Sequence, residues 1–239
     1  MARADSGAGV ILVENYYNNY NDKMHKGTVA TGPRGSDIQS YAFVLFRDVH
    51  TRKYSDGGGG VDASDITLEN TAVRELKEES CNLFRLHSST LVDKAIKVKH
   101  YDYSGYFLRI YNPGNTFTAD YTYNYNLIRS RLPRPHAWLE TDAICRVYIG
   151  QLLLSDVLSA RGDLITLDSL FNPITIDGKT KALIRLYLEK LGLDKESPYD
   201  TIIRQIESTL SVALLHTDNC TSRSHPFVDG THSFYTPSR

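Results

Sequence analysis

Apolar and polar residues form two kinds of pattern along this chain, short apolar runs and longer stretches with helical spacing. The apolar runs have high β-propensity and predict strands at residues 9–13, 41–46, 91–99, 106–111 and 143–149. Apolar positions spaced by about 3.6 residues predict helices at residues 67–80, 151–160, 179–191 and 199–215. We therefore expect an α/β fold with extra helices at its C-terminal end.

Polar and proline-containing segments separate these elements. Residues 14–36 are rich in Tyr, Asn and Gly and predict a loop or an irregular hairpin. Residues 112–136 contain prolines at both ends and predict a long irregular stretch, and residues 216–239 predict a polar tail. Because there is no internal repeat and no clear linker, we expect a single domain over residues 1–215.

Carboxylates gather on one side of the helix predicted at residues 67–80. At about 100° per residue, Glu78, Glu75 and Glu79 lie at about 40°, 100° and 140° from Arg74. A solvated acidic face is one interpretation, since charged runs are usually exposed. A site for a hard divalent cation is the other, because clustered carboxylates repel one another and Mg²⁺ prefers oxygen ligands. The helix alone does not decide between them.

The glycine run that precedes this helix supplies further context. The spacing follows the pattern G-x5-E-x7-R-E-U-x-E-E-x-G-U, in which U is a bulky apolar residue. The matching residues are Gly60, Arg74, Glu75, Leu76, Glu78 and Glu79. The chain therefore resembles the Nudix hydrolase family, over roughly residues 7 to 190.

Three positions depart from that pattern. Ile66 replaces the first Glu, Cys81 replaces the Gly of the last turn, and Asn82 replaces the apolar residue after it. In family members the first Glu typically pairs with the arginine that corresponds to Arg74. The acids that could take its place are Asp62, Asp65 and Glu69.

The resemblance implies a Nudix-like α/β/α sandwich with a mixed sheet. It also implies hydrolysis of a phosphoanhydride bond in a nucleoside diphosphate derivative. Mg²⁺ or Mn²⁺ would be held by Glu75, Glu78 and Glu79, with Arg74 orienting a carboxylate. Glu140 and Asp142 are the candidates for a general base. The departures at Ile66, Cys81 and Asn82 leave an alternative, a catalytically impaired Nudix-fold module that binds nucleotide or RNA.

Substrate contacts are expected from two segments. In a Nudix frame the glycine run, Gly59 and Gly60, would approach the phosphates. The densest aromatic and basic cluster would contact the rest of the substrate, since Tyr can stack on a base and Arg can bind phosphate. Its residues are Tyr121, Tyr123, Tyr125, Arg129 and Arg131. A dinucleoside polyphosphate, a nucleotide sugar or a capped RNA end would suit such a surface.

Composition narrows these expectations. The net charge of −1 excludes binding to nucleic acid or membrane through bulk charge. Three widely spaced cysteines favour a reducing compartment, and with no apolar leader or membrane-length apolar run a cytoplasmic protein is expected. Tyr outnumbers Phe and Trp, with 16 Tyr against 8 Phe and 1 Trp. Tyr favours half-buried surfaces and binding faces, which adds weight to the cluster at residues 121–125.

Overall fold

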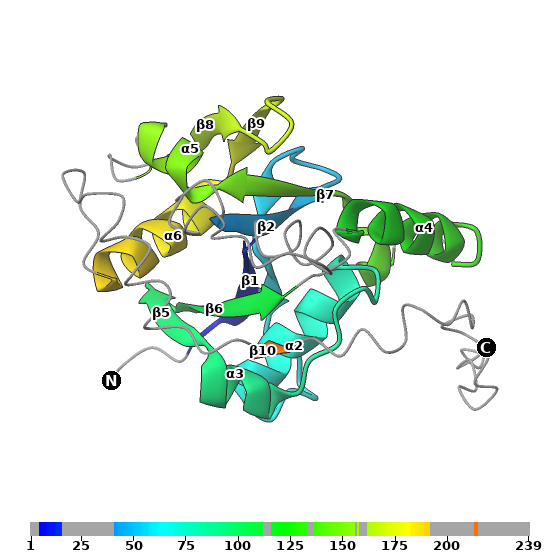
Figure 1. Ribbon diagram of the computed structural model, residues 1–239. Helices are drawn as coiled ribbons and strands as arrows, with labels where there is room; N and C mark the ends of the chain where they lie inside the picture. Colours follow the sequence, from blue (N-terminus) through cyan, green and yellow to red (C-terminus); the bar gives the residue numbers. More distant parts are fainter. Residues whose placement is uncertain are drawn as a thin grey trace, which may run out of the picture.

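The computed structural model of the protein describes residues 5–15, 41–111, 116–132, 136–155, 157, 162–191 and 213–214 (Figure 1). The strands are β1 (Gly7–Asn15), β2 (Tyr41–Asp48), β3 (Tyr54–Ser55), β4 (Gly57–Gly60), β5 (Ile96–His100), β6 (Tyr103–Tyr111), β7 (Thr141–Tyr148), β8 (Leu164–Leu167), β9 (Pro173–Ile176) and β10 (Ala213–Leu214). The helices are α2 (Leu68–Glu79), α3 (Ser88–Lys94), α4 (Phe117–Arg129), α5 (Ile149–Leu154), α6 (Gly178–Lys190) and the 3₁₀ helix η2 (Ala137–Leu139). No helix within the described ranges is long and apolar enough to cross a membrane.

The strands form one mixed sheet whose main path runs β10-β6-β1-β2-β3-β9-β8. β1 lies parallel to β6 and antiparallel to β2. The strands β4, β5 and β7 pair with β1, β6 and β2, respectively. The central strands β1 and β2 are buried on both faces, which accounts for their continuous apolar sequence.

Two apolar cores lie on opposite faces of this sheet. One contains Phe43 and Phe107 of the sheet with Tyr187 of α6, and the rings of Phe107 and Tyr187 stack with centroids 4.0 Å apart. The other contains Leu12 of the sheet with Leu76 of α2, together with side chains from α3 and α4. Figure 1 shows α2 and α3 on one side of the strands and α5 and α6 on the other. The α/β class and the α/β/α sandwich expected from the sequence are confirmed.

The sheet branches where β3 is followed by β4. β1 pairs with β2 between Leu12 and Asn15, but with β4 between Gly7 and Val10. β2 leaves β1 and pairs with β3 at Phe46. Residues 54–60 therefore fill a fork that opens between β1 and β2. Asp56 lies at the apex of the fork and is fully buried.

Several predicted elements need correction. Residues 91–94 belong to α3 and not to a strand, because Leu91 is buried while its neighbour Val92 is exposed, as in a one-sided short helix. The irregular stretch predicted at 112–136 contains α4, whose buried residues Phe117, Tyr121 and Ile128 recur at helical spacing. The glycine run forms strand β4, and β3, β8 and β9 were not predicted.

The C-terminal predictions are tested only in part. The helix predicted at 179–191 is confirmed as α6. The helix predicted at 151–160 begins earlier and ends at Leu154, before a stretch that lies largely outside the described residues. Of the helix predicted at 199–215, only 213–214 are described, and they form β10 beside β6. Residues 16–36 and 216–239 also lie outside the described residues.

Candidate functional site

The helix α2 carries the acidic face and has well-defined ends. Thr67 caps its N-terminus, accepting a hydrogen bond from the backbone N–H of Asn70 at 3.2 Å. At its C-terminus, Cys81 donates to the carbonyl of Glu78 and Asn82 donates to that of Lys77, a Schellman ending. Cys81 and Asn82 have φ of +52° and +63°. Cys81 therefore adopts the left-handed conformation that the pattern reserves for Gly, at a cost of about 1 kcal/mol.

Arg74 joins the loop before α2 to the acidic face. Its guanidinium donates to Asp65 through Nη2 at 2.9 Å and through Nε at 3.2 Å. Its Nη1 donates to Glu75 at 2.7 Å and to Glu78 at 3.4 Å, while Nη2 also donates to the carbonyl of Gly60 at 2.9 Å. One guanidinium thus fixes the loop, the end of β4 and two carboxylates.

Asp65 is the acid that pairs with Arg74 in place of the missing Glu. Its side chain is only 5% exposed, and it also accepts from the backbone N–H of Asp62 at 2.9 Å. The hydrogen bond from Arg74 lowers the pKa of Asp65, outweighing the opposite effect of burial. Ile66, at the pattern position itself, is 91% exposed. The carboxylate partner of Arg74 is therefore at position 65, one residue before the position at which the pattern places it.

Three of the four carboxylates of α2, those of Glu75, Glu78 and Glu79, have raised pKa values. Burial raises the pKa of Glu75 and of Glu78, and the hydrogen bonds from Arg74 oppose this only in part. Burial, with the charges of Asp56 and Glu75, raises the pKa of Glu79 well above its ordinary value. Oε2 of Glu79 has no hydrogen-bond partner among the described residues. Buried carboxylates without enough donors are suited to binding a cation.

The two candidates for a general base occupy different surroundings. The exposed Glu140 follows η2 and lies close enough to α2 that its charge raises the pKa values of Glu75 and Glu78. Asp142 instead forms ion pairs with Arg47 at 2.8 Å and Arg52 at 2.5 Å. Asp142 is therefore engaged in ion pairs, and Glu140 alone is placed beside the acidic face.

The glycines predicted to approach phosphate have close protein neighbours. A Cβ at Gly59 would lie 2.6 Å from the carboxyl of Glu75, so glycine is needed there for the approach of α2 to β4. The carbonyl of Gly60 accepts from Arg74. Packing therefore explains Gly59, whereas a Cβ at Gly60 would meet only the carbonyl oxygen of Ser6, at 3.9 Å. A phosphate contact for either residue stays a prediction.

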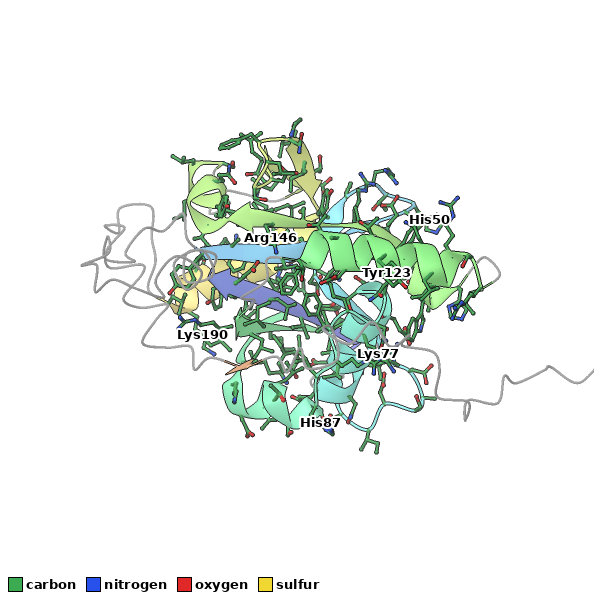
Figure 2. The ribbon with its side chains drawn as sticks, turned by 45° about the vertical axis from the view of Figure 1, so that its right-hand side comes forward. His50, Lys77, His87, Tyr123, Arg146 and Lys190 are labelled. Atoms are coloured by element: carbon green, nitrogen blue, oxygen red, sulfur yellow. The ribbon has the colours of Figure 1, made fainter. Side chains whose placement is uncertain are left out.

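The aromatic and basic cluster lies on α4, and its members differ in accessibility. Tyr121 is buried in the core, and its hydroxyl lies 2.8 Å from the hydroxyl of Thr141, so its predicted role in base stacking is wrong for this structure. Tyr125 is half-buried, with its ring stacked on that of Tyr121. Tyr123 is 58% exposed, and in Figure 2 it lies on the same side of the view as Lys77 of α2. Arg129 and Arg131 are exposed at the end of the cluster.

Sequence reasoning missed a buried polar network at the fork of the sheet. The carboxylate of Asp56 accepts from Tyr103 at 2.6 Å and from Thr180 at 3.0 Å, and it pairs with Lys179 at 3.3 Å. Asp56 and Lys179 both act electrostatically on Glu79. The sequence signal was the Asp that opens the glycine run, but its partners lie far along the chain.

The acidic face can be compared with what a divalent ion requires. Its donors are carboxylate oxygens, which suit Mg²⁺ or Mn²⁺, and the unpartnered oxygen of Glu79 is available. As the described side chains stand, no three Asp, Glu, His or Cys groups converge on one point. Arg74 engages Glu75 and Glu78, whereas for Glu79 the backbone N–H of Gly58 acts to lower the pKa, against the larger effect of burial. The donor chemistry fits a divalent ion, and binding one would draw the carboxylates together.

Comparisons with known proteins add little beyond this. No family model matches the chain, and no curated protein matches it. A crystal structure of C. elegans Ap4A hydrolase matches with 15% identity and a TM-score of 0.29, covering 47% of this chain and 73% of that one. A binary complex of C. elegans Ap4A hydrolase matches with 15% identity and a TM-score of 0.26, covering 46% and 69%. At these values the likeness establishes no family, so the case for a function rests on the residues of this chain.

Proposed function

We propose that this protein hydrolyses a phosphoanhydride bond in a nucleoside diphosphate derivative, using Mg²⁺ or Mn²⁺. The observation that carries this proposal is the set of hydrogen bonds made by Arg74. They tie Asp65, Glu75 and Glu78 to one guanidinium, so the carboxylates are ordered although Ile66 replaces the first Glu of the pattern. A solvated acidic face would need no such set of hydrogen bonds.

The residues of the acidic face would divide the work. Glu75, Glu78 and Glu79 would hold the metal, which when bound polarises phosphorus and lowers the pKa of a bound water. Arg74 orients Glu75 and Glu78, and Asp65 holds Arg74. Glu140, exposed beside them, would accept the proton of the attacking water.

The exposed part of the aromatic and basic cluster would select the group attached to the phosphates. Tyr123 is exposed and would stack on a base, and the exposed Arg129 and Arg131 would contact phosphate. A dinucleoside polyphosphate, a nucleotide sugar and a capped RNA end all carry both features. A substrate of this class would approach the metal from the side of α4 and η2.

A panel assay tests this proposal. Purified protein is incubated with a dinucleoside polyphosphate, a nucleotide sugar and a cap analogue, with Mn²⁺, with Mg²⁺ and with a chelator. We expect metal-dependent hydrolysis that falls by about 10²–10³-fold in Glu79→Gln, as when one electrostatic group of a site is removed. Glu189→Gln, an exposed glutamate on α6, is the matched control and should keep full activity.

Two outcomes would count against hydrolysis. Turnover that survives in Glu79→Gln or in chelator would place the chemistry elsewhere. Tight binding of one of these compounds with no metal-dependent turnover would favour the alternative function, a Nudix-fold module that binds nucleotide or RNA.

A further inference from the structure

Trp138, the only tryptophan of the chain, lies in η2 and is held against the end of α2. Its carbonyl accepts a hydrogen bond from Sγ of Cys81 at 3.5 Å, and its N–H donates to Nδ1 of His136 at 3.2 Å. At the start of β7, the hydroxyl of Thr141 donates to the carbonyl of Glu79 at 2.5 Å. Direct hydrogen bonds therefore join η2 and the start of β7 to the end of the acidic helix.

The contact with Trp138 gives a reason for the cysteine that ends α2. Cys81 has a φ of +52°, a conformation that favours glycine, and glycine is the residue that the family pattern places there. A glycine would avoid the strain, but it would have no side chain to reach the carbonyl of Trp138. The departure from the pattern at position 81 therefore serves to hold η2 against the acidic helix.

Lys77, in the last turn of α2, places a cation over the indole of Trp138. The ammonium lies 5.6 Å from the ring centroid, near the outer limit of a cation–π contact. Lys77 is exposed and forms no ion pair with the described residues. Trp138 is half-buried and packs against the apolar core beneath α2 and α4. A weakly held, exposed lysine therefore covers part of the indole at the surface.

An indole and an ammonium in this arrangement suit the two ends of one nucleotide. An aromatic ring attracts a base of any sequence by stacking, and a lysine ammonium pairs with phosphate as a point charge. The base and the phosphates of a nucleotide are joined through one ribose, so the groups that bind them need to be neighbours, as Trp138 and Lys77 are. Lys77 also precedes Glu78 of the acidic face, which is the side on which the phosphates would meet the metal.

We propose that Trp138 is a specificity-determining residue that stacks on the base of the substrate. The base displaces the ammonium of Lys77 from the indole, and the ammonium then pairs with a phosphate of the same molecule. This inference rests on the proposed function, from which the substrate class is taken. It adds to Tyr123 a second aromatic group, one that direct contacts tie to the acidic helix.

Tryptophan fluorescence tests the stacking directly, because Trp138 is the only tryptophan in the full chain. The probes are ADP and inorganic pyrophosphate, each titrated in the presence of Mg²⁺ with excitation selective for tryptophan. We expect ADP to quench the emission to a saturating level, because its adenine stacks on the indole. Pyrophosphate carries the same charged groups without a base and should cause little of this quenching.

Substitutions at Trp138 test its part in substrate selection. Trp138→Leu should raise KM for the best compound of the panel by about 10- to 100-fold, the range for loss of a stacked base, with little change in kcat. Trp138→Tyr keeps an aromatic face and should stay within about threefold of the wild type. Lys94→Met, at an exposed position in the last turn of α3, is the control and should behave like the wild type.

A substitution at Lys77 separates the phosphate contact from the stacking. Lys77→Met should weaken the binding of ADP and of pyrophosphate by the same factor, about fivefold for an exposed charge pair, as measured by calorimetry. ADP should still quench the emission of this variant, because Trp138 is unchanged. Thermal unfolding checks that each variant is folded. Should Trp138→Leu fail to fold, the wild type and Lys77→Met still test the stacking by fluorescence.

Four results would overturn the inference. They are binding of ADP without a change in emission, quenching by pyrophosphate as strong as that by ADP, a KM in Trp138→Leu equal to that in Lys94→Met, and a Lys77→Met variant that binds pyrophosphate like the wild type. If ADP quenches the emission but no compound of the panel is hydrolysed, the proposed function fails and the stacking stands. If a compound is hydrolysed but ADP leaves the emission unchanged, only this inference fails.

Discussion

Arg74 meets its carboxylate partner one position earlier in the loop than the family pattern requires. The turn closed by Asp62 and Asp65 directs the Asp65 side chain at the guanidinium and leaves Ile66 facing solvent. A shorter acid, one residue earlier, therefore makes the contact that a Glu at position 66 would make. The pattern alone suggests that Arg74 has lost its carboxylate partner, whereas the contacts show that Asp65 is its partner.

Because Asp65 and not residue 66 pairs with Arg74, substitutions at these two neighbouring positions should differ in their effect on activity. Asp65→Asn should lower kcat/KM by about 10- to 100-fold, because Arg74 would lose the charged partner that orients it. Ile66→Glu should stay within about twofold of wild type, because its side chain is exposed and the role is filled. Steady-state kinetics check both, and a clear gain in Ile66→Glu would show that Arg74 lacks a sufficient partner.

The raised pKa of Glu79 predicts a pH-dependent effect on stability. Above about pH 4.5, its ordinary pKa, the unfolded chain releases this proton while the folded protein retains it, because burial disfavours the charge. Stability contributed by Glu79 is therefore present at low pH and lost as pH rises through the folded pKa. Glu79→Gln should raise the metal-free unfolding free energy at pH 8 by about 1–3 kcal/mol, and the gain should vanish near pH 4.

Denaturant unfolding at several pH values with chelator present measures this effect. Addition of Mn²⁺ should stabilise the wild type and not Glu79→Gln, since only the wild type gains a bound ion. A variant that is less stable than wild type at pH 8 would contradict the assigned environment of Glu79.

Contacts between residues close together in the sequence could be predicted, whereas contacts between residues far apart in the sequence could not. Glu75, Glu78 and Arg74 are brought together by helix periodicity, so their proximity could be predicted from spacing alone. The network around Asp56 could not, because Tyr103 and Thr180 are 47 and 124 residues away from it. Only the tertiary fold determines such contacts, and a lone Asp before a glycine run carries no sign of them.

At the scale of elements, the helix α4 shows why local propensity misleads. Its sequence is rich in Tyr, Asn and Thr, which favour helices weakly, and prolines flank it. It is helical because Phe117, Tyr121 and Ile128 fall on one face and are buried against the sheet. The aromatic cluster is therefore divided by the helix into a packing side and an exposed side.

Two tyrosines on α4 should respond differently to removal of the ring. Tyr121→Ala should lower the unfolding free energy by about 3–5 kcal/mol, as for large buried aromatic residues. Tyr123→Ala should change it by less than about 0.5 kcal/mol and should raise KM for a base-containing substrate. Urea denaturation and kinetics measure the two effects, and an unchanged KM in Tyr123→Ala would remove this residue from the substrate site.

At the scale of the molecule, the two cores are joined by a single sheet. Leu76 of α2 lies in one core and Leu183 of α6 in the other, and both are fully buried. Because β1 and β2 contribute side chains to both cores, we propose that the two layers unfold together as one domain. Strands buried on both faces were predictable from their apolar runs, but the short strands β3, β8 and β9 were not, since four residues or fewer give no usable period.

Large-to-small variants in each core test whether the two layers unfold together. Leu76→Ala and Leu183→Ala should each lower the unfolding free energy by about 2–5 kcal/mol. In the double variant the losses should add within about 0.5 kcal/mol, because the side chains share no contact across the sheet. Far-ultraviolet circular dichroism and tyrosine fluorescence should report one transition. Two separate transitions would divide the chain into independent units.

During synthesis on the ribosome, the polar network at the fork can form only after α6 has been made. The acidic helix is complete by Glu79, but Thr180 and Lys179 are synthesised about one hundred residues later. Until then Asp56 has neither its ion partner nor one of its hydroxyl donors. The nascent chain therefore carries Asp56 without its ion partner until α6 is synthesised, and the arrival of α6 completes both the apolar layer and the charge balance.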